Sequence, residues 1–86
     1  MITYKIDIAA ALNEIGFNVY RAKATGFLSQ DTLKKLKSHD TRVSLDSINR
    51  LCTLLDMRIE DVIEFEMSPQ DKEKRESVLT AKKRKE

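Results

Sequence analysis

Residues 18–38 read NVYRAKATGFLSQDTLKKLKS, and the rest of the chain is interpreted around the two short helices that they predict. Asn18 is a favourable N-cap, because its side chain can accept from a backbone N–H of the first turn. It starts a helix over about residues 19–25, which Gly26 can end in the left-handed conformation that glycine adopts without strain. The first part of this segment therefore predicts a short helix and a tight turn.

A second short helix follows the turn. Ser29 is its N-cap, and it runs over about residues 30–38 with Leu33 and Leu36 facing inward. Its outward face then carries polar and charged side chains. The whole segment predicts two helices joined by a turn, each with one side against a core.

Three more helices are expected on either side of this pair. A first helix, which Gly16 can end, has an apolar stripe made of Ile8, Ala11, Leu12 and Ile15. A fourth follows the N-cap Ser44, with Asp46 in its first turn, where the helix dipole favours an anion. The apolar stripe of this fourth helix is Leu45, Ile48, Leu51, Cys52 and Leu55. A fifth, short helix begins near residue 59, and its apolar side consists of Val62 and Ile63.

The two ends of this helical region alternate with period 2, which is the signal of a strand. The alternating apolar residues are Ile2, Tyr4 and Ile6 at the start, and Ile63, Phe65 and Met67 at the end. We expect these segments to pair as a small two-stranded sheet. Because such a ribbon is only marginally stable alone, packing or a dimer partner has to support it, and Tyr4 and Phe65 are either core or dimer contacts.

The composition changes from Ser68 onward. Pro69 is the only proline, and the apolar residues among the 17 that follow it are Val78, Leu79 and Ala81. So few apolar residues cannot hold a helix against a core. We therefore divide the chain into one domain over residues 1–67 and a charged, basic tail over residues 68–86, either flexible or a marginal helix. The terminal run Lys82-Lys83-Arg84-Lys85 could touch phosphates.

Length and composition exclude several classes of function. The 86 residues are 41% hydrophobic and 35% charged, with 2 Gly and 1 Pro, which suits one small helical domain without a deep cleft. A single cysteine cannot form an internal disulfide, and no His and Cys spacing indicates a metal site. We find no phosphate loop and no convincing catalytic set, so we expect no enzyme, cofactor or small-molecule substrate. With no membrane-length apolar run and no signal peptide, a cytoplasmic location is expected.

The charges are unevenly distributed along the chain. Residues 21–42 contain six basic and two acidic residues, a net charge of +4, whereas residues 43–67 contain two basic and six acidic residues, a net charge of −4. A basic middle beside an acidic segment suggests one face that meets a polyanion. Ordinary solvated surface charge is the alternative.

Two short helices joined by a tight turn and braced on both sides form the helix-turn-helix architecture of DNA-binding proteins. Over about three quarters of its length the chain resembles the short Cro/CI-type (XRE-like) regulators of bacteria and phages. The segments that carry the resemblance are residues 1–5, 18–21, 28–36, 44–48, Leu51, Cys52, Leu55 and residues 60–65. The resemblance implies an all-α, five-helix, lambda-repressor-like domain that binds double-stranded DNA as a homodimer.

Two residues depart from the usual pattern of that family. The register that keeps every cap and core position places Lys23 where the family often has alanine, and Phe27 where it often has glycine. Phe27 would fill the turn poorly if a left-handed residue were required there. We expect Gly26 to take that conformation one residue earlier.

The helix over residues 30–38 is expected to enter the major groove. Its candidate base-contacting residues are Gln30, Asp31, Lys34 and Lys35, which are of types that bond the edges of adenine, cytosine and guanine. Flanking residues would hold the DNA backbone without reading sequence, and the candidates are Asn18, Tyr20, Arg21, Ser29, Lys37, His39 and Arg42.

Each candidate also has a plainer interpretation. For the base-contacting set it is ordinary solvation, and Asp31 could serve only the helix dipole. His39 could be a solvated loop side chain, and Tyr20 could pack at the edge of the core. Cys52 is expected as a buried, inert thiol.

The sequence thus predicts a sequence-specific, double-stranded DNA-binding transcriptional regulator, a repressor encoded by a bacterium or phage. The alternative is a protein-binding module, such as an antirepressor, antitoxin-like protein or nuclease-inhibiting partner, on a diverged helix-turn-helix fold. The departures at Lys23 and Phe27 motivate that alternative.

Overall fold

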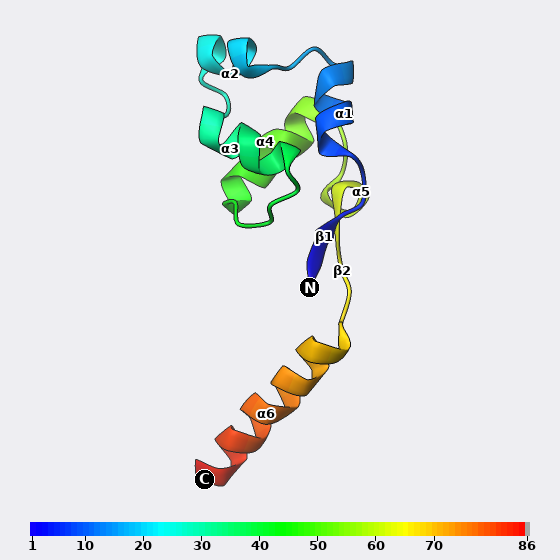
Figure 1. The fold of residues 1–86 in the computed structure, drawn as a ribbon, viewed down its shortest axis with the longest axis vertical. Coiled ribbons are helices and arrows are strands. Elements are labelled where there is room, and N and C mark those ends of the chain that lie inside the picture. Colours follow the sequence, from blue (N-terminus) through cyan, green and yellow to red (C-terminus); the bar gives the residue numbers. More distant parts are fainter. Residues whose placement is uncertain (86) are drawn as a thin grey trace.

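A computed structural model describes the backbone of residues 1–85 and the side chains of residues 1–80 (Figure 1). The elements in this part of the chain are β1 (Ile2–Tyr4), α1 (Ile8–Glu14), α2 (Val19–Thr25), α3 (Gln30–Lys37), α4 (Leu45–Leu55), α5 (Ile59–Val62), β2 (Ile63–Phe65) and α6 (Pro69–Lys85). The helical fold with a small sheet is confirmed. Ile63, expected on the fifth helix, instead begins β2.

Side-chain caps determine where the helices begin. The three caps expected from the sequence are present, and each accepts from the backbone N–H three residues later: Asn18 (2.9 Å), Ser29 (3.1 Å) and Ser44 (3.0 Å). Asp7, which the sequence interpretation did not use, caps α1 in the same way, at 3.1 Å from the N–H of Ala10. These local bonds satisfy N–H groups that the first turn of a helix leaves unpaired.

The core lies where α1, α2, α3 and α4 meet. Its buried side chains come from every helix of the domain: Ile8, Leu12, Phe17, Ala22, Leu28, Leu33, Leu36, Ile48, Leu51 and Val62. None of the buried residues in the described part of the chain is polar or charged. Burial of apolar surface is therefore the main force that holds α3 against the domain.

Two residues of the predicted apolar stripes lie outside the core, which corrects the sequence interpretation. Leu45 is 80% exposed, because it is the first residue of α4 and side chains lean toward the helix N-terminus, past the end of the core. Ile15 is 45% exposed, because α1 ends at Glu14 and the chain turns at Gly16, where φ is +74°. Phe17 is buried in the core beyond this turn.

The strands pair in the predicted arrangement but are shorter than the alternating pattern. They are antiparallel, with Ile2 opposite Phe65 and Tyr4 opposite Ile63. The Tyr4 hydroxyl donates to the carbonyl oxygen of Asp40 at 2.9 Å, so this residue belongs to the core edge. Phe65 is 63% exposed and has no such role.

The tail forms a continuous helix, α6, that extends away from the domain (Figure 1). Ser68 and Asp71 cap it reciprocally, with side chains that accept from each other's backbone N–H at 3.0 and 3.3 Å. The radius of gyration is 16.9 Å, above the roughly 12 Å of a compact chain of this length. A helix was one of the two alternatives expected for this tail, and it extends away from the core of the domain (Figure 1). The side chains of Lys82, Lys83, Arg84 and Lys85 lie outside the described residues.

Candidate nucleic-acid interface

The turn between α2 and α3 is made by Gly26. Its φ is +67°, and its N–H bonds the carbonyl oxygen of Ala22 at 2.9 Å, which closes α2. Phe27 follows with negative φ, and Leu28 then enters the core at 3% exposure. As expected, the left-handed position lies one residue before Phe27, so this departure leaves the turn unstrained.

Arg50 of α4 also contacts this turn. Its Nη1 donates to the carbonyl oxygen of Phe27 at 2.8 Å, and its guanidinium lies 5.4 Å from the centroid of the Phe27 ring. Its Nε also donates to the Asp46 carboxylate at 3.1 Å, which orients the side chain. Arg50 could not be identified from the sequence, because nothing in its own helix indicates a contact with the turn.

The outward face of α3 presents polar groups to solvent. Gln30, Asp31 and Lys34 are exposed, and Lys35 is half-buried. The Lys35 ammonium lies 3.3 Å from the Asp31 carboxylate, one helical turn away. Asp31 therefore does more than favour the helix dipole, because it neutralises part of the charge of Lys35. Among the described residues Lys34 forms no ion pair.

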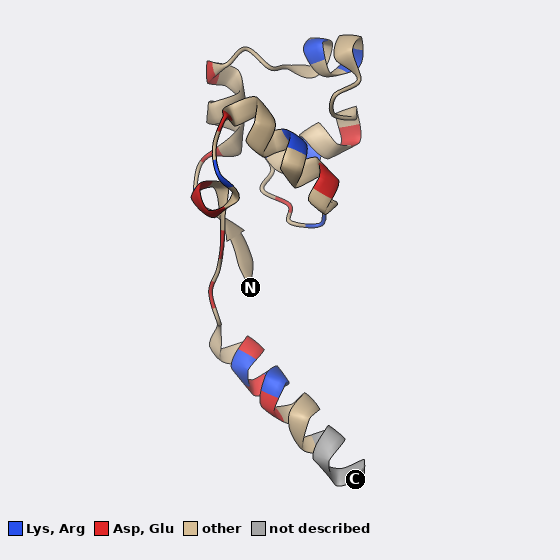
Figure 2. Cartoon of the chain, turned by 180° about the vertical axis from the view of Figure 1, so that it is seen from behind, with Lys and Arg blue, Asp and Glu red and all other residues tan. Residues whose placement is uncertain are grey.

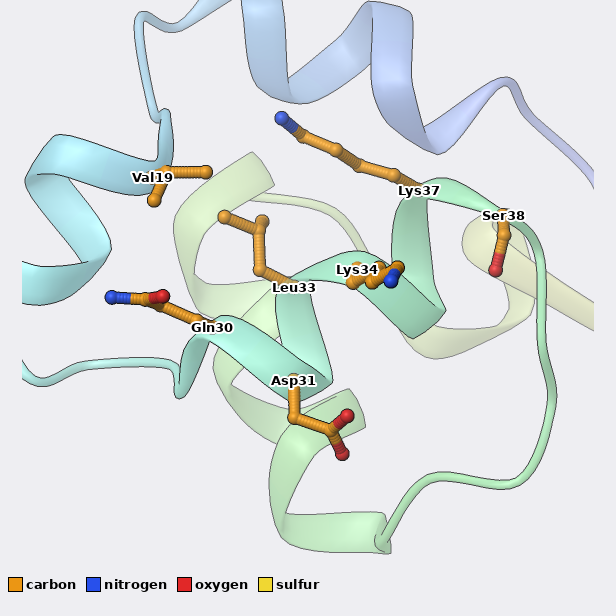
Figure 3. A pocket seen from close by; sticks show the side chains of 7 residues that line it. All are labelled: Val19, Gln30, Asp31, Leu33, Lys34, Lys37 and Ser38. Carbon is orange, nitrogen blue, oxygen red and sulfur yellow. The ribbon is translucent and has the colours of Figure 1, made fainter.

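A hollow of about 680 Å³ lies beside this face, where α3 meets the start of α2 (Figure 3). Its lining consists of Val19, Gln30, Asp31, Leu33, Lys34, Lys37 and Ser38. Val19 and Leu33 supply apolar surface, and the amide of Gln30 lies at their edge (Figure 3). The hollow thus combines a small apolar floor with hydrogen-bonding and cationic groups.

The residues expected to contact the DNA backbone at the starts of α2 and α3 are exposed, but two of them already form hydrogen bonds within the protein. Tyr20 is 78% exposed, which corrects the alternative of packing at the core edge. Arg21 is exposed next to it. The side-chain oxygens of Asn18 and Ser29 cap helices, so Asn18 has its NH₂ group left for a phosphate, and the Ser29 hydroxyl donates to Thr32.

His39 is exposed, as expected for a loop side chain, but its ring also makes specific contacts. Its Nε2 accepts from the backbone N–H of Ile8 at 3.1 Å, and its ring centroid lies 5.3 Å from that of Tyr4. The residue also has φ of +60°, an unusual backbone conformation for a side chain of this size. These contacts tie the end of α3 to the start of α1, a structural role that the sequence interpretation missed.

Arg42 is paired with Asp40. Its Nε and Nη2 donate to the two carboxylate oxygens at 3.0 Å each, and the bonds lower the pKa of Asp40 to about 2. The guanidinium side chain remains 87% exposed. It can reach a phosphate while a carboxylate holds its position.

Charge is segregated across the domain. Basic positions lie on α2 and α3, whereas α5 and β2 carry acidic residues on the opposite side (Figure 2). Positive charge is therefore concentrated on the side that carries α2 and α3 (Figure 2).

Residues 5–68 match a family model described as a Cro/C1-type HTH DNA-binding domain. The chain belongs to this family. The match covers both helices of the motif, the caps and the core around them, and it agrees with the family resemblance found in the sequence. A search of curated proteins and a search of solved structures each gave no significant match. This Cro/C1-type protein is thus a DNA-binding regulator by family.

Further features of the described part of this Cro/C1-type protein concern metal binding, membrane spans and its cysteine. Within the described residues, no cluster of His, Cys, Asp and Glu could hold a metal ion, and no helix is long and apolar enough to cross a membrane. Cys52 is only partly buried, which corrects the expected burial, and desolvation raises the pKa of its thiol.

Proposed function

We propose that the chain is a sequence-specific repressor that places α3 in the major groove of double-stranded DNA. The observation that carries this proposal is the outward row of exposed Gln30, exposed Lys34 and half-buried Lys35 on α3, beside Tyr20 and Arg21 at the start of α2. Glutamine can bond adenine through two hydrogen bonds, and lysine can donate to guanine O6 and N7. Repression is the simplest effect, because a bound domain excludes other proteins from its site.

The remaining contacts would hold the sugar-phosphate backbone. Tyr20, Arg21 and the NH₂ group of Asn18 flank one side of α3, and Lys37 and Arg42 lie at or beyond its end. Ser29 would contribute the N-terminal end of α3, where backbone N–H groups attract an anion. We assign His39 a supporting place here, because its contacts to Ile8 and Tyr4 position the loop that carries Arg42.

The binding chemistry is tested by the salt dependence of affinity. Fluorescence anisotropy with a duplex selected by the protein should show affinity that falls steeply with salt, because several phosphate contacts release counterions. The double variant Lys34→Ala with Lys35→Ala should lose affinity and keep its circular dichroism spectrum, since neither side chain belongs to the core. Salt-independent binding, or unchanged affinity of the double variant, would favour the protein-binding alternative.

The proposed repressor acts as a homodimer. The sheet face that places Tyr4 and Ile63 against the core continues outward to Ile2 and Phe65, which are 48% and 63% exposed. Together with Ile59 at 47% exposure, these residues form an apolar surface next to the acidic α5. A second copy that presents the same surface would cover it, and it lies on the side away from α2 and α3 (Figure 1).

Analytical ultracentrifugation tests this interface. Phe65→Ser should shift the protein toward monomer, whereas Leu45→Ser removes an apolar side chain elsewhere that is even more exposed, 80% against 63%, and should leave the dimer intact. A wild-type monomer at high micromolar concentration, with and without DNA, would remove the dimer from the proposal.

We also propose that residues 1–67 form the DNA-binding domain and that residues 68–86 form a separate tail in the bacterial or phage protein. The support is the exposed surface of α6 and its main link to the domain, a 2.7 Å ion pair between the Met1 ammonium and Asp71. Limited proteolysis should cut within residues 72–80 before it cuts the domain, because proteases cleave exposed, weakly held segments first.

A further inference from the structure

Val19 is an apolar side chain at an exposed place in the interface. It is the first residue of α2, it is 49% exposed, and it lines the hollow beside Gln30, Lys34 and Lys37 (Figure 3). Leu33 behind it is buried at 1% exposure, so Val19 is the accessible one of the two aliphatic side chains there. About half of its surface is therefore open to a partner.

The groups around Val19 indicate what would cover it. Lys34 and Lys37 give the hollow a cationic rim, and neither is in an ion pair among the described residues. The carboxylate of Asp31 is turned away from Val19 and Leu33 (Figure 3). The hollow is therefore complementary to an anionic partner that presents a small apolar group, and the amide of Gln30 adds a hydrogen-bonding edge next to it.

Duplex DNA presents one such group in its major groove, the C5 methyl of thymine. Valine has no donor, so its side chain cannot hold a phosphate as its neighbours Tyr20 and Arg21 can. We propose that Val19 is a specificity-determining residue, which selects thymine through its methyl group at a base pair next to the one contacted by Gln30. The inference rests on the proposed major-groove function of α3.

The test uses uracil, which differs from thymine only by the missing methyl. A duplex is first selected from a randomised pool by the wild-type protein, and each thymine in it is then replaced singly by uracil. One position in each half-site should lose about fourfold in affinity, the value of one buried methyl group. Placing 5-methylcytosine there should bind more tightly than cytosine, because it restores the methyl group.

Variants assign that methyl contact to a residue. Val19→Ala should bind the thymine and uracil duplexes equally at that position, and Val19→Ile should keep the discrimination. The Gln30→Ala variant should lose its preference among bases at the neighbouring base pair, the one that Gln30 is proposed to contact. Both Val19 substitutions are at an exposed helix start, and circular dichroism would confirm that the fold is kept.

The outcomes separate this inference from the function on which it rests. Discrimination against uracil that persists unchanged in Val19→Ala, or its absence from the wild-type protein, would overturn the role of Val19 while DNA binding stands. If the wild-type protein selects no duplex at all, the proposed function fails and the thymine contact fails with it.

Discussion

Arg50 in α4 donates a hydrogen bond from Nη1 to the carbonyl oxygen of Phe27 at 2.8 Å, and its guanidinium lies over the ring of the same residue. Phe27 is half-buried beside the core. Phe27, which stands where the family often has glycine, is thus the residue that Arg50 of α4 contacts. The turn that leads into α3 is therefore held by a contact from α4 as well as by its own backbone hydrogen bonds.

Replacing Arg50 with methionine should therefore destabilise the domain, because it keeps the stem but removes both contacts to Phe27. A hydrogen bond to a charged donor contributes about 1.5–3 kcal/mol and an exposed cation–π contact about 0.5–1 kcal/mol. We expect the free energy of unfolding in urea to fall by about 2 kcal/mol. Asp46→Asn, which breaks only an exposed ion pair of Arg50, should cost about 0.2–1 kcal/mol. Equal losses of unfolding free energy in the two variants would show that the contacts of Arg50 to Phe27 do not stabilise the fold.

His39→Ala should also lower stability, since it leaves the N–H of Ile8 without its side-chain acceptor. A buried donor left unsatisfied costs about 1–3 kcal/mol, and we expect the lower end because this bond is part-buried. Alanine also has a Cβ, so the change does not relieve the left-handed backbone at φ +60°. The adjacent Ser38→Ala removes only an exposed bond from its hydroxyl to the carbonyl oxygen of Lys35 and is the control. Chemical denaturation that ranks the two variants equally would show that His39 is not a structural link.

The pair of Asp40 and Arg42 predicts a titration at low pH. The pKa of Asp40 is lowered to about 2 in the folded protein, chiefly by hydrogen bonds from Arg42, against an ordinary value of 3.8. The ionised carboxylate therefore stabilises the fold above about pH 4, and this contribution is lost as the pH falls toward 2. In an NMR titration of the side-chain carboxyl, Arg42→Ala should raise the pKa of Asp40 back toward 3.8. An unchanged pKa would contradict the pairing.

The two lysines on α3 should contribute unequally to DNA affinity. Lys35 is partly neutralised by Asp31 at 3.3 Å, whereas Lys34 has no ion-pair partner among the described residues. We expect Lys34→Ala to weaken binding about tenfold and to reduce the salt slope by about 1. Lys35→Ala should have a smaller effect in the wild-type protein. In a protein that already carries Asp31→Asn its effect should be larger, because Lys35 is then no longer neutralised. Anisotropy titrations at several salt concentrations would measure both, and a larger loss for Lys35→Ala would reverse this ranking.

Local chemistry explains which parts of the fold could be predicted. The caps Asn18, Ser29 and Ser44 bond within one helical turn, so sequence alone locates them. The strand pairing followed from alternation, because one sheet face has to be apolar where it meets the core.

What the sequence missed depends on contacts between distant segments. Arg50 reaches Phe27 across 23 positions, and His39 reaches Ile8 across 31. Leu45 fits its helical stripe by spacing, yet it is exposed because the core ends before the first turn of α4. The placement of Val19 beside Gln30 likewise requires the turn geometry.

Sequence-specific DNA binding is tested most directly by selection from a randomised duplex pool at physiological salt. The wild-type protein should enrich a two-fold symmetric site with half-sites about 34 Å apart, and Gln30→Ala should lose one base preference within each half-site. A single enriched half-site would keep the DNA function and remove the dimer. No enrichment at all would contradict sequence-specific binding and would mean that the helix-turn-helix serves another kind of partner.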